Sequence, residues 1–213
     1  TARTNLAGFG TQTAAVAAGG NPFTNATENY NGSAWTSSGN LPSNLEAGVC
    51  FGTQTAGVIA SGNIPPNTNA SAEYNGSAWT AGNNMSRGAG TTGTGFGIQT
   101  AGIYATGNVS GSASTLVEQY NGTNWTEIAE VNRARGGAGA SQAGSVTSAV
   151  IFGGGPGSGV DAQTETWNGS AWTEVADLNT ARQEAGSFGN SSNNAVFAGG
   201  ASPSPKVAIV ESW

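Results

Sequence analysis

The sequence of 213 residues contains no histidine and a single cysteine. The lack of histidine excludes Ser-His-Asp and Cys-His catalysis, imidazole-ligated metal sites and the commonest general base. The lone Cys50 can form neither an internal disulfide nor half of a thiolate zinc site, so cysteine usage does not indicate a redox compartment. We therefore expect a protein that is not an enzyme and that has no catalytic residues, no metal site and no cofactor.

Charged residues are also scarce, at 8% of the chain against about 25% in an ordinary soluble protein. Six lysine and arginine residues face twelve aspartate and glutamate residues, which gives a net charge of −6. This balance argues against nucleic acid, whose binding depends on cations that neutralise phosphates, and against anionic membranes. No run approaches the roughly 18 apolar residues of a spanning helix, so we expect no membrane insertion.

Glycine is abundant, with 35 residues, and Asn, Ser and Thr fill much of the remainder. These residues favour turns and caps over helices, so the composition predicts short strands joined by many tight turns. The chain also carries six Trp, seven Phe and four Tyr at regular positions. Disordered chains are usually poor in aromatic residues, so disorder is a poor fit.

One phrase recurs along the chain: a glutamate, then Tyr or Trp, then Asn-Gly, and a few residues later Trp-Thr. Its complete copies are residues 28–36, 73–80, 118–126 and 165–173, and a partial copy is 211–213. The copies lie about 45 residues apart, a period typical of propeller blades. Asn-Gly between two aromatic-bearing strands predicts a hairpin with a type I′ turn.

A second phrase of small and apolar residues ending in glycine precedes each copy of the first. It occupies residues 14–20, 56–62, 101–107, 148–154 and 194–200, each after a Gly/Phe-rich stretch at 7–10, 48–52, 95–97, 136–140 and 185–189. One unit therefore comprises four strands: A (Gly/Phe), B (small and apolar), C (ending in Tyr or Trp) and D (Trp-Thr). The unit boundaries are about 1–40, 41–84, 85–132, 133–179 and 180–213.

These units predict an all-β protein, a five-bladed β-propeller of four-stranded antiparallel blades forming one domain over residues 1–213. Small residues suit the crowded strands near the axis, and large aromatic residues fill the gaps between blades. The residues expected in this structural role are Tyr30, Trp35, Tyr74, Trp79, Tyr120, Trp125, Trp167, Trp172 and Trp213.

Five A, five B and five C strands are accompanied by only four D strands. We therefore expect the last blade to lack its outer strand, and the chain to be a segment of a longer protein. An open outer edge is a pairing hazard that proteins usually cover, so we expect further polypeptide or a strand-completing partner there. A sixth blade supplied by further sequence would also fit.

The units resemble kelch repeats, in which an apolar strand ending in Gly-Gly, a loop, a strand ending in Tyr, a turn, Trp and an Arg-containing connection follow in order. Unit four matches most closely, through residues 149–154, 165–169, 172–175 and 178–182. The resemblance covers the whole chain and implies a β-propeller. The units depart from the usual kelch pattern in two ways, which bear on the subfamily more than on the fold. The Tyr-to-Trp spacing is shorter, and Ser61-Gly62 and Thr106-Gly107 stand in place of Gly-Gly.

The low charge and the nearly identical Tyr-Asn-Gly-Ser-Ala-Trp-Thr units also resemble repeat arrays in virion proteins of tailed bacteriophages, particularly marine ones. This resemblance implies an extracellular or virion-surface location and a part in a tail fibre or other appendage that attaches to a host cell. The expected partner is then a surface glycan or a host receptor.

In a kelch-like blade, the D-to-A and B-to-C connections emerge on one face, which we call the loop face. All six cations map to it: Arg3, Arg87, Arg133, Arg135, Arg182 and Lys206. Arg3 and Arg182 occupy matching positions, so we expect them to pair with nearby Glu or strand-end carbonyls. Variable loops on a regular scaffold usually carry binding. The candidate ligand-binding residues are Phe23, Ile64, Arg87, Arg133, Arg135, Asp161 and Lys206.

Three functions remain open. The first is a non-catalytic binding and display module that recognises a surface glycan or protein through the loop face. The alternative is a purely structural decoration or spacer that contacts neighbouring virion subunits. A glycan-active enzyme domain is the least favoured, because hydrolysis needs two carboxylates flanking a bond. The glutamates that recur once per unit, at 28, 73, 118, 165 and 211, instead indicate a structural role.

Overall fold

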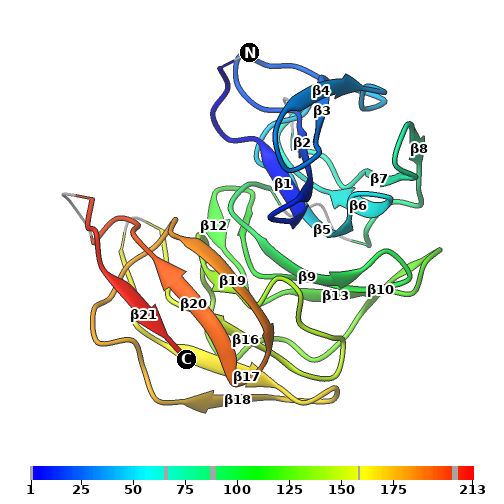
Figure 1. Cartoon of the computed structure of the whole chain (residues 1–213). Coiled ribbons are helices and arrows are strands. Elements are labelled where there is room, and N and C mark those ends of the chain that lie inside the picture. The colour runs from blue at the N-terminus through cyan, green and yellow to red at the C-terminus, as the bar shows by residue number, and fades with distance from the viewer. Residues whose placement is uncertain (1, 65–66, 87–89, 158, 203–205) are drawn as a thin grey trace.

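The computed structural model describes residues 2–64, 67–86, 90–157, 159–202 and 206–213. The described residues form 21 strands, all in antiparallel pairs, and include no helix long and apolar enough to cross a membrane. Five small sheets are arranged as a five-bladed β-propeller, with the chain passing from one sheet to the next in order (Figure 1). The predicted fold class is therefore confirmed.

Four blades follow the predicted order A, B, C and D from the axis outward, and the fifth follows the order A, B and C. Blade 1 contains β1 (Ala7–Thr11), β2 (Ala14–Ala18), β3 (Thr27–Tyr30) and β4 (Trp35–Ser38). Blade 2 contains β5 (Val49–Thr53), β6 (Ala56–Ala60), β7 (Ser71–Tyr74) and β8 (Trp79–Ala81). Blade 3 contains β9 (Thr94–Ile98), β10 (Ala101–Ala105), β13 (Val117–Tyr120) and β14 (Trp125–Glu127), with a small hairpin of β11 (Asn108–Val109) and β12 (Ser112–Ala113) in its B-to-C loop.

Blade 4 contains β15 (Gly139–Ala140), β16 (Ala149–Phe152), β17 (Thr164–Trp167) and β18 (Trp172–Val175). Blade 5 has three strands, β19 (Gly186–Ser191), β20 (Asn194–Ala198) and β21 (Val210–Ser212). Among the described residues, the last blade therefore contains strands A, B and C only, as the sequence predicts.

The turn between strands C and D is a hairpin in four blades, but the expected turn type is wrong. In blade 1, Asn31 N–H donates to the carbonyl of Ala34, and positive φ occurs at Gly32 (92°) but not at Asn31. The turn is therefore centred on Gly32-Ser33, whereas a type I′ turn at Asn-Gly needs positive φ at both residues. Asn31 instead caps the turn, because its Oδ1 accepts the N–H groups of Ser33 (3.0 Å) and Ala34 (2.9 Å).

Aromatic side chains join successive blades through one repeated contact. A phenylalanine on strand A of one blade packs edge-to-face on the strand D tryptophan of the next. The pairs are Phe9–Trp79 (6.2 Å between ring centroids), Phe51–Trp125 (6.2 Å) and Phe96–Trp172 (6.5 Å). Ser141 takes the corresponding position in blade 4, where Phe152 contacts Phe197 of blade 5 instead (4.9 Å).

Two glycines make room for these rings. A Cβ atom at Gly57 would lie 2.2 Å from the Phe9 ring, and one at Gly102 would lie 2.1 Å from the Phe51 ring. Such distances are far shorter than a carbon–carbon contact of about 3.5 Å. The close approach of the preceding blade therefore requires small residues on strand B. This agrees with the prediction that small residues suit the crowded strands near the axis.

The ring of blades has an open side between blade 1 and blade 5. The inner strands of successive blades contact one another, β1 with β5, β5 with β9, β9 with β15 and β15 with β19, whereas β19 makes no comparable contact with β1. The sheets at the two ends of the chain stand apart in Figure 1.

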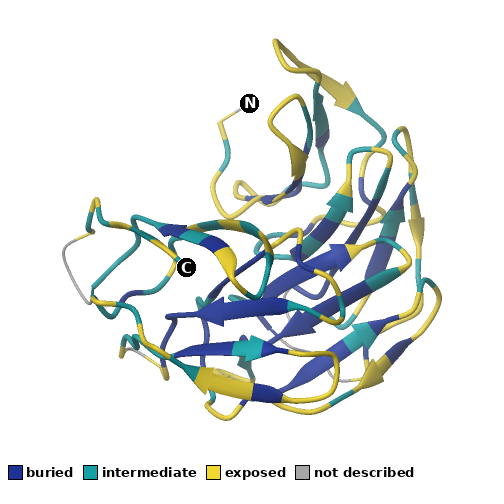
Figure 2. Ribbon diagram, turned by 60° about the horizontal axis from the view of Figure 1, so that its bottom comes forward, coloured by how far each residue is buried: buried dark blue, intermediate teal, exposed yellow. Residues whose placement is uncertain are grey.

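The burial of aromatic side chains reflects this open side. Trp35 of blade 1 is 50% exposed, although the other strand D tryptophans are largely buried. Phe188 of blade 5 occupies the repeat position of Phe9, Phe51 and Phe96, and it is 57% exposed. Strand β9 of blade 3 is buried along most of its length, whereas β19 of blade 5 alternates between exposed and half-buried residues. Figure 2 shows the buried residues gathered on the strands between the two ends of the chain.

The repeated aromatic contact predicts unequal effects for the same substitution at equivalent positions. Phe51→Ala removes a buried ring between blades 2 and 3, and we expect it to lower the free energy of unfolding by about 3–5 kcal/mol. Phe188→Ala removes an exposed ring, and its effect should stay within about 0.5 kcal/mol. Urea denaturation followed by Trp fluorescence measures both values. Equal losses for the two variants would contradict this description of the blade interfaces.

Candidate functional site

The loop face predicted from the sequence is formed by short bridges between connections. The D-to-A connection that enters a blade pairs with the B-to-C loop of that blade through Thr4–Asn21, Glu46–Asn63, Gly136–Gly155 and Gln183–Ala201. Both kinds of connection therefore lie at one end of the blades, which is the loop face predicted to carry the candidate residues.

Three of the predicted arginines share one structural environment on this face. Each guanidinium forms an ion pair with the strand C glutamate of its own blade and also donates to backbone carbonyls. Arg3 and Arg135 donate to carbonyls at both ends of the B-to-C loop, whereas Arg182 donates to the carbonyls of Phe197 and Thr180. The ion pairs are Arg3–Glu28, Arg135–Glu165 and Arg182–Glu211. The expectation that Arg3 and Arg182 pair with Glu and strand-end carbonyls is therefore confirmed.

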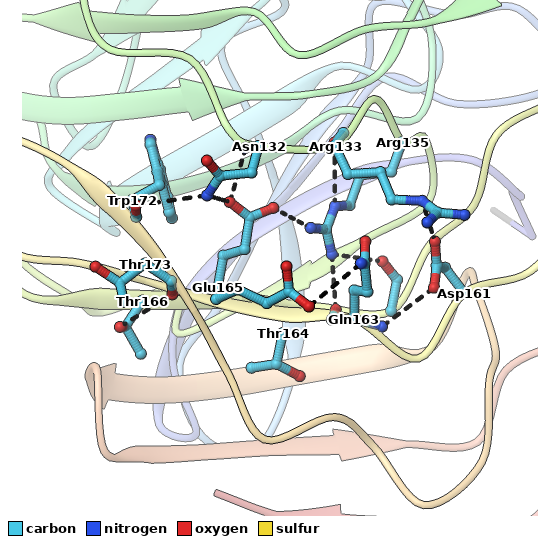
Figure 3. A network of polar contacts seen from close by, with 12 residues as sticks. Asn132, Arg133, Arg135, Asp161, Gln163, Thr164, Glu165, Thr166, Trp172 and Thr173 are labelled. Carbon is cyan, nitrogen blue, oxygen red and sulfur yellow. Dashed lines mark hydrogen bonds and ion pairs between the residues drawn. The ribbon is translucent and has the colours of Figure 1, made fainter.

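Arg135 was proposed as a ligand candidate, but its side chain is fully buried. Nη1 donates to the carbonyls of Gln163 (2.7 Å) and Gly153 (3.3 Å), and Nη2 pairs with Oε1 of Glu165 (Figure 3). Burial lowers the pKa of Arg135, and the charge of Glu165 opposes that shift. The guanidinium therefore holds the loop to the blade and offers no surface to a ligand.

Glu165 also links blade 4 to the connection that precedes it. Its Oε2 accepts the backbone N–H (2.8 Å) and the side-chain amide (2.7 Å) of Asn132, which follows blade 3. Glu211 accepts the same two hydrogen bonds from Asn179 (2.7 and 2.8 Å). Glu165 and Glu211 thus join the Arg of their own blade to the chain leaving the previous blade, a role the sequence indicated only in general terms.

Arg133 and Asp161 lie together beside Arg135, and the structure joins them by an ion pair of 2.6 Å (Figure 3). The Arg133 side chain is half-exposed, while Asp161 also accepts the N–H groups of Ala162 (2.9 Å) and Gln163 (3.3 Å). Of the predicted candidates in blade 4, Arg133 is therefore the one with accessible charge.

Phe23 borders a hollow of about 360 Å³ next to blade 1. Its exposed ring shares this hollow with the Arg3–Glu28 pair and with Ser37 and Asn40. The site thus combines an apolar ring with charged, amide and hydroxyl groups within one concave surface, the pattern of a ligand pocket.

Ile64 lies elsewhere, in an apolar hollow of about 180 Å³ with Leu41, Leu45, Ile59 and Ala72. Lys206 is exposed on blade 5, and Arg87 lies outside the described residues. The structure therefore distributes the described candidates over several blades, and among them it brings together Arg133, Arg135 and Asp161.

The sequence reasoning missed the hollow at the centre of the ring, although it placed the A strands nearest the axis. In each blade, residues of strand A or of the turn after it line a cavity of about 220 Å³, among them Thr53, Gln142 and Phe188. Cys50 also lines it, and its thiol donates to the carbonyl of Gly8 (3.1 Å). Burial raises the pKa of this thiol, so Cys50 is a poor nucleophile at neutral pH.

Among the described residues, no group of three or more His, Cys, Asp or Glu side chains is placed to hold a metal ion. The strand C carboxylates are engaged with structural partners, as in the three ion pairs above and the contact of Glu73 with the Tyr120 hydroxyl. The groups that this face presents are an aromatic ring, amides, hydroxyls and guanidinium groups.

The anchoring of β21 predicts a dependence of stability on pH. Partial burial disfavours the charged form of Glu211, but hydrogen bonds from Arg182 and Asn179 outweigh it and hold the pKa below its ordinary value. The stabilisation is present above the unfolded pKa of about 4.3 and is lost as pH falls through the folded pKa. We expect Glu211→Gln to lower the urea midpoint at pH 7 and to approach the unsubstituted protein in acid, once the pH has fallen below the folded pKa of Glu211.

Glu184→Gln, which changes an exposed carboxylate, is the matched control and should leave the midpoint nearly unchanged. If Glu211→Gln lowered the urea midpoint as much in acid as at pH 7, this role of the carboxylate would be contradicted.

No protein-family model matches the chain, and no curated protein matches its sequence. The similarities to kelch repeats and to bacteriophage repeat arrays therefore rest on the residues of the repeat unit alone.

Proposed function

We propose that this protein is a non-catalytic binding and display module that recognises a glycan or protein on a host-cell surface through its loop face. The observation that carries the proposal is the hollow beside Phe23. A sugar ring has an apolar C–H face and a rim of hydroxyl groups, which suits an aromatic ring flanked by Ser37, Asn40 and the Arg3–Glu28 pair.

The scaffold supports this use of the loops. The same antiparallel strand order in every blade carries B-to-C loops that differ between blades, from the Phe23 loop to the β11–β12 hairpin of blade 3. Binding residues are commonly carried on such loops because the rigid strands fix their ends. Weak individual contacts of this kind gain strength when many copies are displayed together.

We further propose that the display takes place on a bacteriophage particle, as part of a tail fibre or other appendage at the virion surface. The resemblance of the Tyr-Asn-Gly-Ser-Ala-Trp-Thr units to virion repeat arrays supports this setting, as does the scarcity of charge. The partners are then a surface glycan or host receptor.

A structural role as decoration or spacer is the second candidate, and the exposed aromatic rings of Trp35 and Phe188 favour it. Large exposed apolar side chains at an open side suit contact with neighbouring virion subunits. A glycan-active enzyme domain receives less support, because the strand C carboxylates Glu28, Glu165 and Glu211 are engaged in ion pairs.

The adhesion proposal is tested by removing one ring. We expect Phe23→Ala to lower apparent affinity for glycan arrays and for bacterial cells by at least about tenfold, because exposed aromatic anchors dominate such contacts. The control is Ile98→Ala, a similarly exposed apolar residue beside the A-to-B turn at the other end of its blade. The Phe23 hollow would be rejected as the binding site if Phe23→Ala bound as tightly as the unsubstituted protein, or if it lost no more affinity than Ile98→Ala.

A further inference from the structure

The loop face of blade 2 contains the hollow of about 180 Å³ that Ile64 lines. Pro42 and Ala81 also line it and are exposed, so the hollow opens to the surface. The D-to-A connection, the B-to-C loop and the outer strand β8 of this blade therefore meet around one apolar opening. The walls of the hollow are buried side chains of one hydrophobic cluster: Leu41, Leu45, Ile59 and Ala72.

The repeat shows which residues stand at this place in blade 1. Leu45 directly precedes the first bridge residue of blade 2, as Arg3 does in blade 1. Ala72 lies two residues before the tyrosine that ends strand C, as Glu28 does. Blades 4 and 5 have the same kind of Arg–Glu ion pair as blade 1. In blade 2, leucine and alanine therefore replace both members of the pair.

The glutamate of blade 2 does not restore the missing charge. The repeated phrase aligns Glu73 with the other strand C glutamates, but the pairing of Tyr74 with Trp79 shows that Glu73 is one residue out of position. Successive side chains of a strand point to opposite faces of the sheet. Glu73 accordingly accepts the hydroxyl of Tyr120 in blade 3, away from the hollow beside Ala72.

The polar side chains that line the hollow offer little to a polar ligand. Ser71 Oγ donates to the carbonyl of Asn83 (2.7 Å), and Thr68 Oγ1 accepts the N–H of Ala70 (3.0 Å). The hydroxyl of Ser43 lies at the exposed rim. A sugar hydroxyl or a charged group inside the hollow would lose its hydrogen bonds to water without replacement. The chemistry of the walls therefore selects an apolar group.

The volume of the hollow indicates the size of that group. In another protein, a cavity of about 150 Å³ lined by Leu, Ile and Phe stays dry and binds benzene. Pockets that enclose a whole drug-sized ligand measure about 300–1,000 Å³. The blade 2 hollow, at about 180 Å³, thus fits one apolar group of about six carbon atoms. Because the hollow is open at the surface, the rest of a larger molecule can remain outside.

We propose that the blade 2 hollow binds one apolar side chain of a partner protein, of the size of leucine or phenylalanine. A polypeptide presents such a side chain while its backbone amides stay in water at the rim, whereas an acyl chain of myristoyl length exceeds this volume. Apolar anchors in fitted pockets carry much of the binding energy at protein interfaces. The site does not depend on what the Phe23 hollow binds.

Small probes test the proposal on the whole chain, isotope-labelled at its Ile and Leu methyl groups and observed by NMR. We expect N-acetyl-leucinamide and benzene to shift the methyl signals of Leu45, Ile59 and Ile64, with a Kd of the order of millimolar. Methyl glucoside, a polar probe, should leave these signals unchanged, because the walls offer its hydroxyl groups no partners.

Substitution at the rim provides the second comparison. Ala81→Leu places a larger side chain in the opening, and we expect it to weaken binding of N-acetyl-leucinamide at least about tenfold. Thr80→Leu adds the same side chain at the next residue, on the opposite face of β8, and should stay within about twofold. Leu45→Arg combined with Ala72→Glu, which rebuilds the ion pair of blade 1, should abolish binding.

An absence of shifts with both probes, an equal response to methyl glucoside, or an unchanged Kd in Ala81→Leu would each overturn the proposal. Binding of benzene without binding of N-acetyl-leucinamide would overturn the assignment to a protein side chain. The probe comparison needs no substitution, so it stays decisive even where the double substitution disturbs blade 2. Phe23→Ala should leave these shifts unchanged, so the two hollows can be rejected separately.

Discussion

The edge-to-face contact between a strand A phenylalanine and the strand D tryptophan of the next blade is the constraint on which this architecture depends. It demands a very small residue on strand B, which is why Gly57 and Gly102 lie beneath the rings of Phe9 and Phe51. Blade spacing is thus set by side-chain packing, and the polar links through Glu165 and Glu211 fix the same spacing at the loop face.

Much of the fold is predictable because the repeat places every strand. The four-strand order, the hairpins at Asn-Gly and the structural pairing of Arg3 and Arg182 all follow from matching positions between units. The type I′ turn was wrong because the asparagine in this phrase uses its side chain to cap the turn, and glycine alone takes positive φ. Dipeptide preference does not show which of two adjacent positions becomes the centre of a turn.

The candidate site was less predictable, for a physical reason. Trp35, Trp79 and Trp172 follow the same Asn-Gly-Ser-Ala sequence, yet the first is half-exposed and the others are packed, because burial depends on whether another blade lies alongside. Arg135 follows an alanine and lies four residues before strand A of its blade, as Arg3 and Arg182 do, so its repeat position could have separated it from the half-exposed Arg133. The cavity at the centre of the ring arises only when residues from all five blades are brought together.

The open side of the ring has a consequence for how the molecule resists unfolding. In a row of repeats that contact only their neighbours, stability spreads along the row, and a unit with one neighbour is the weakest. Blades 1 and 5 should therefore exchange amide hydrogens and fray first, while blade 3 persists longest. Any molecule that covers an end blade would act as a cap, and its binding energy would be felt by blades that it never touches.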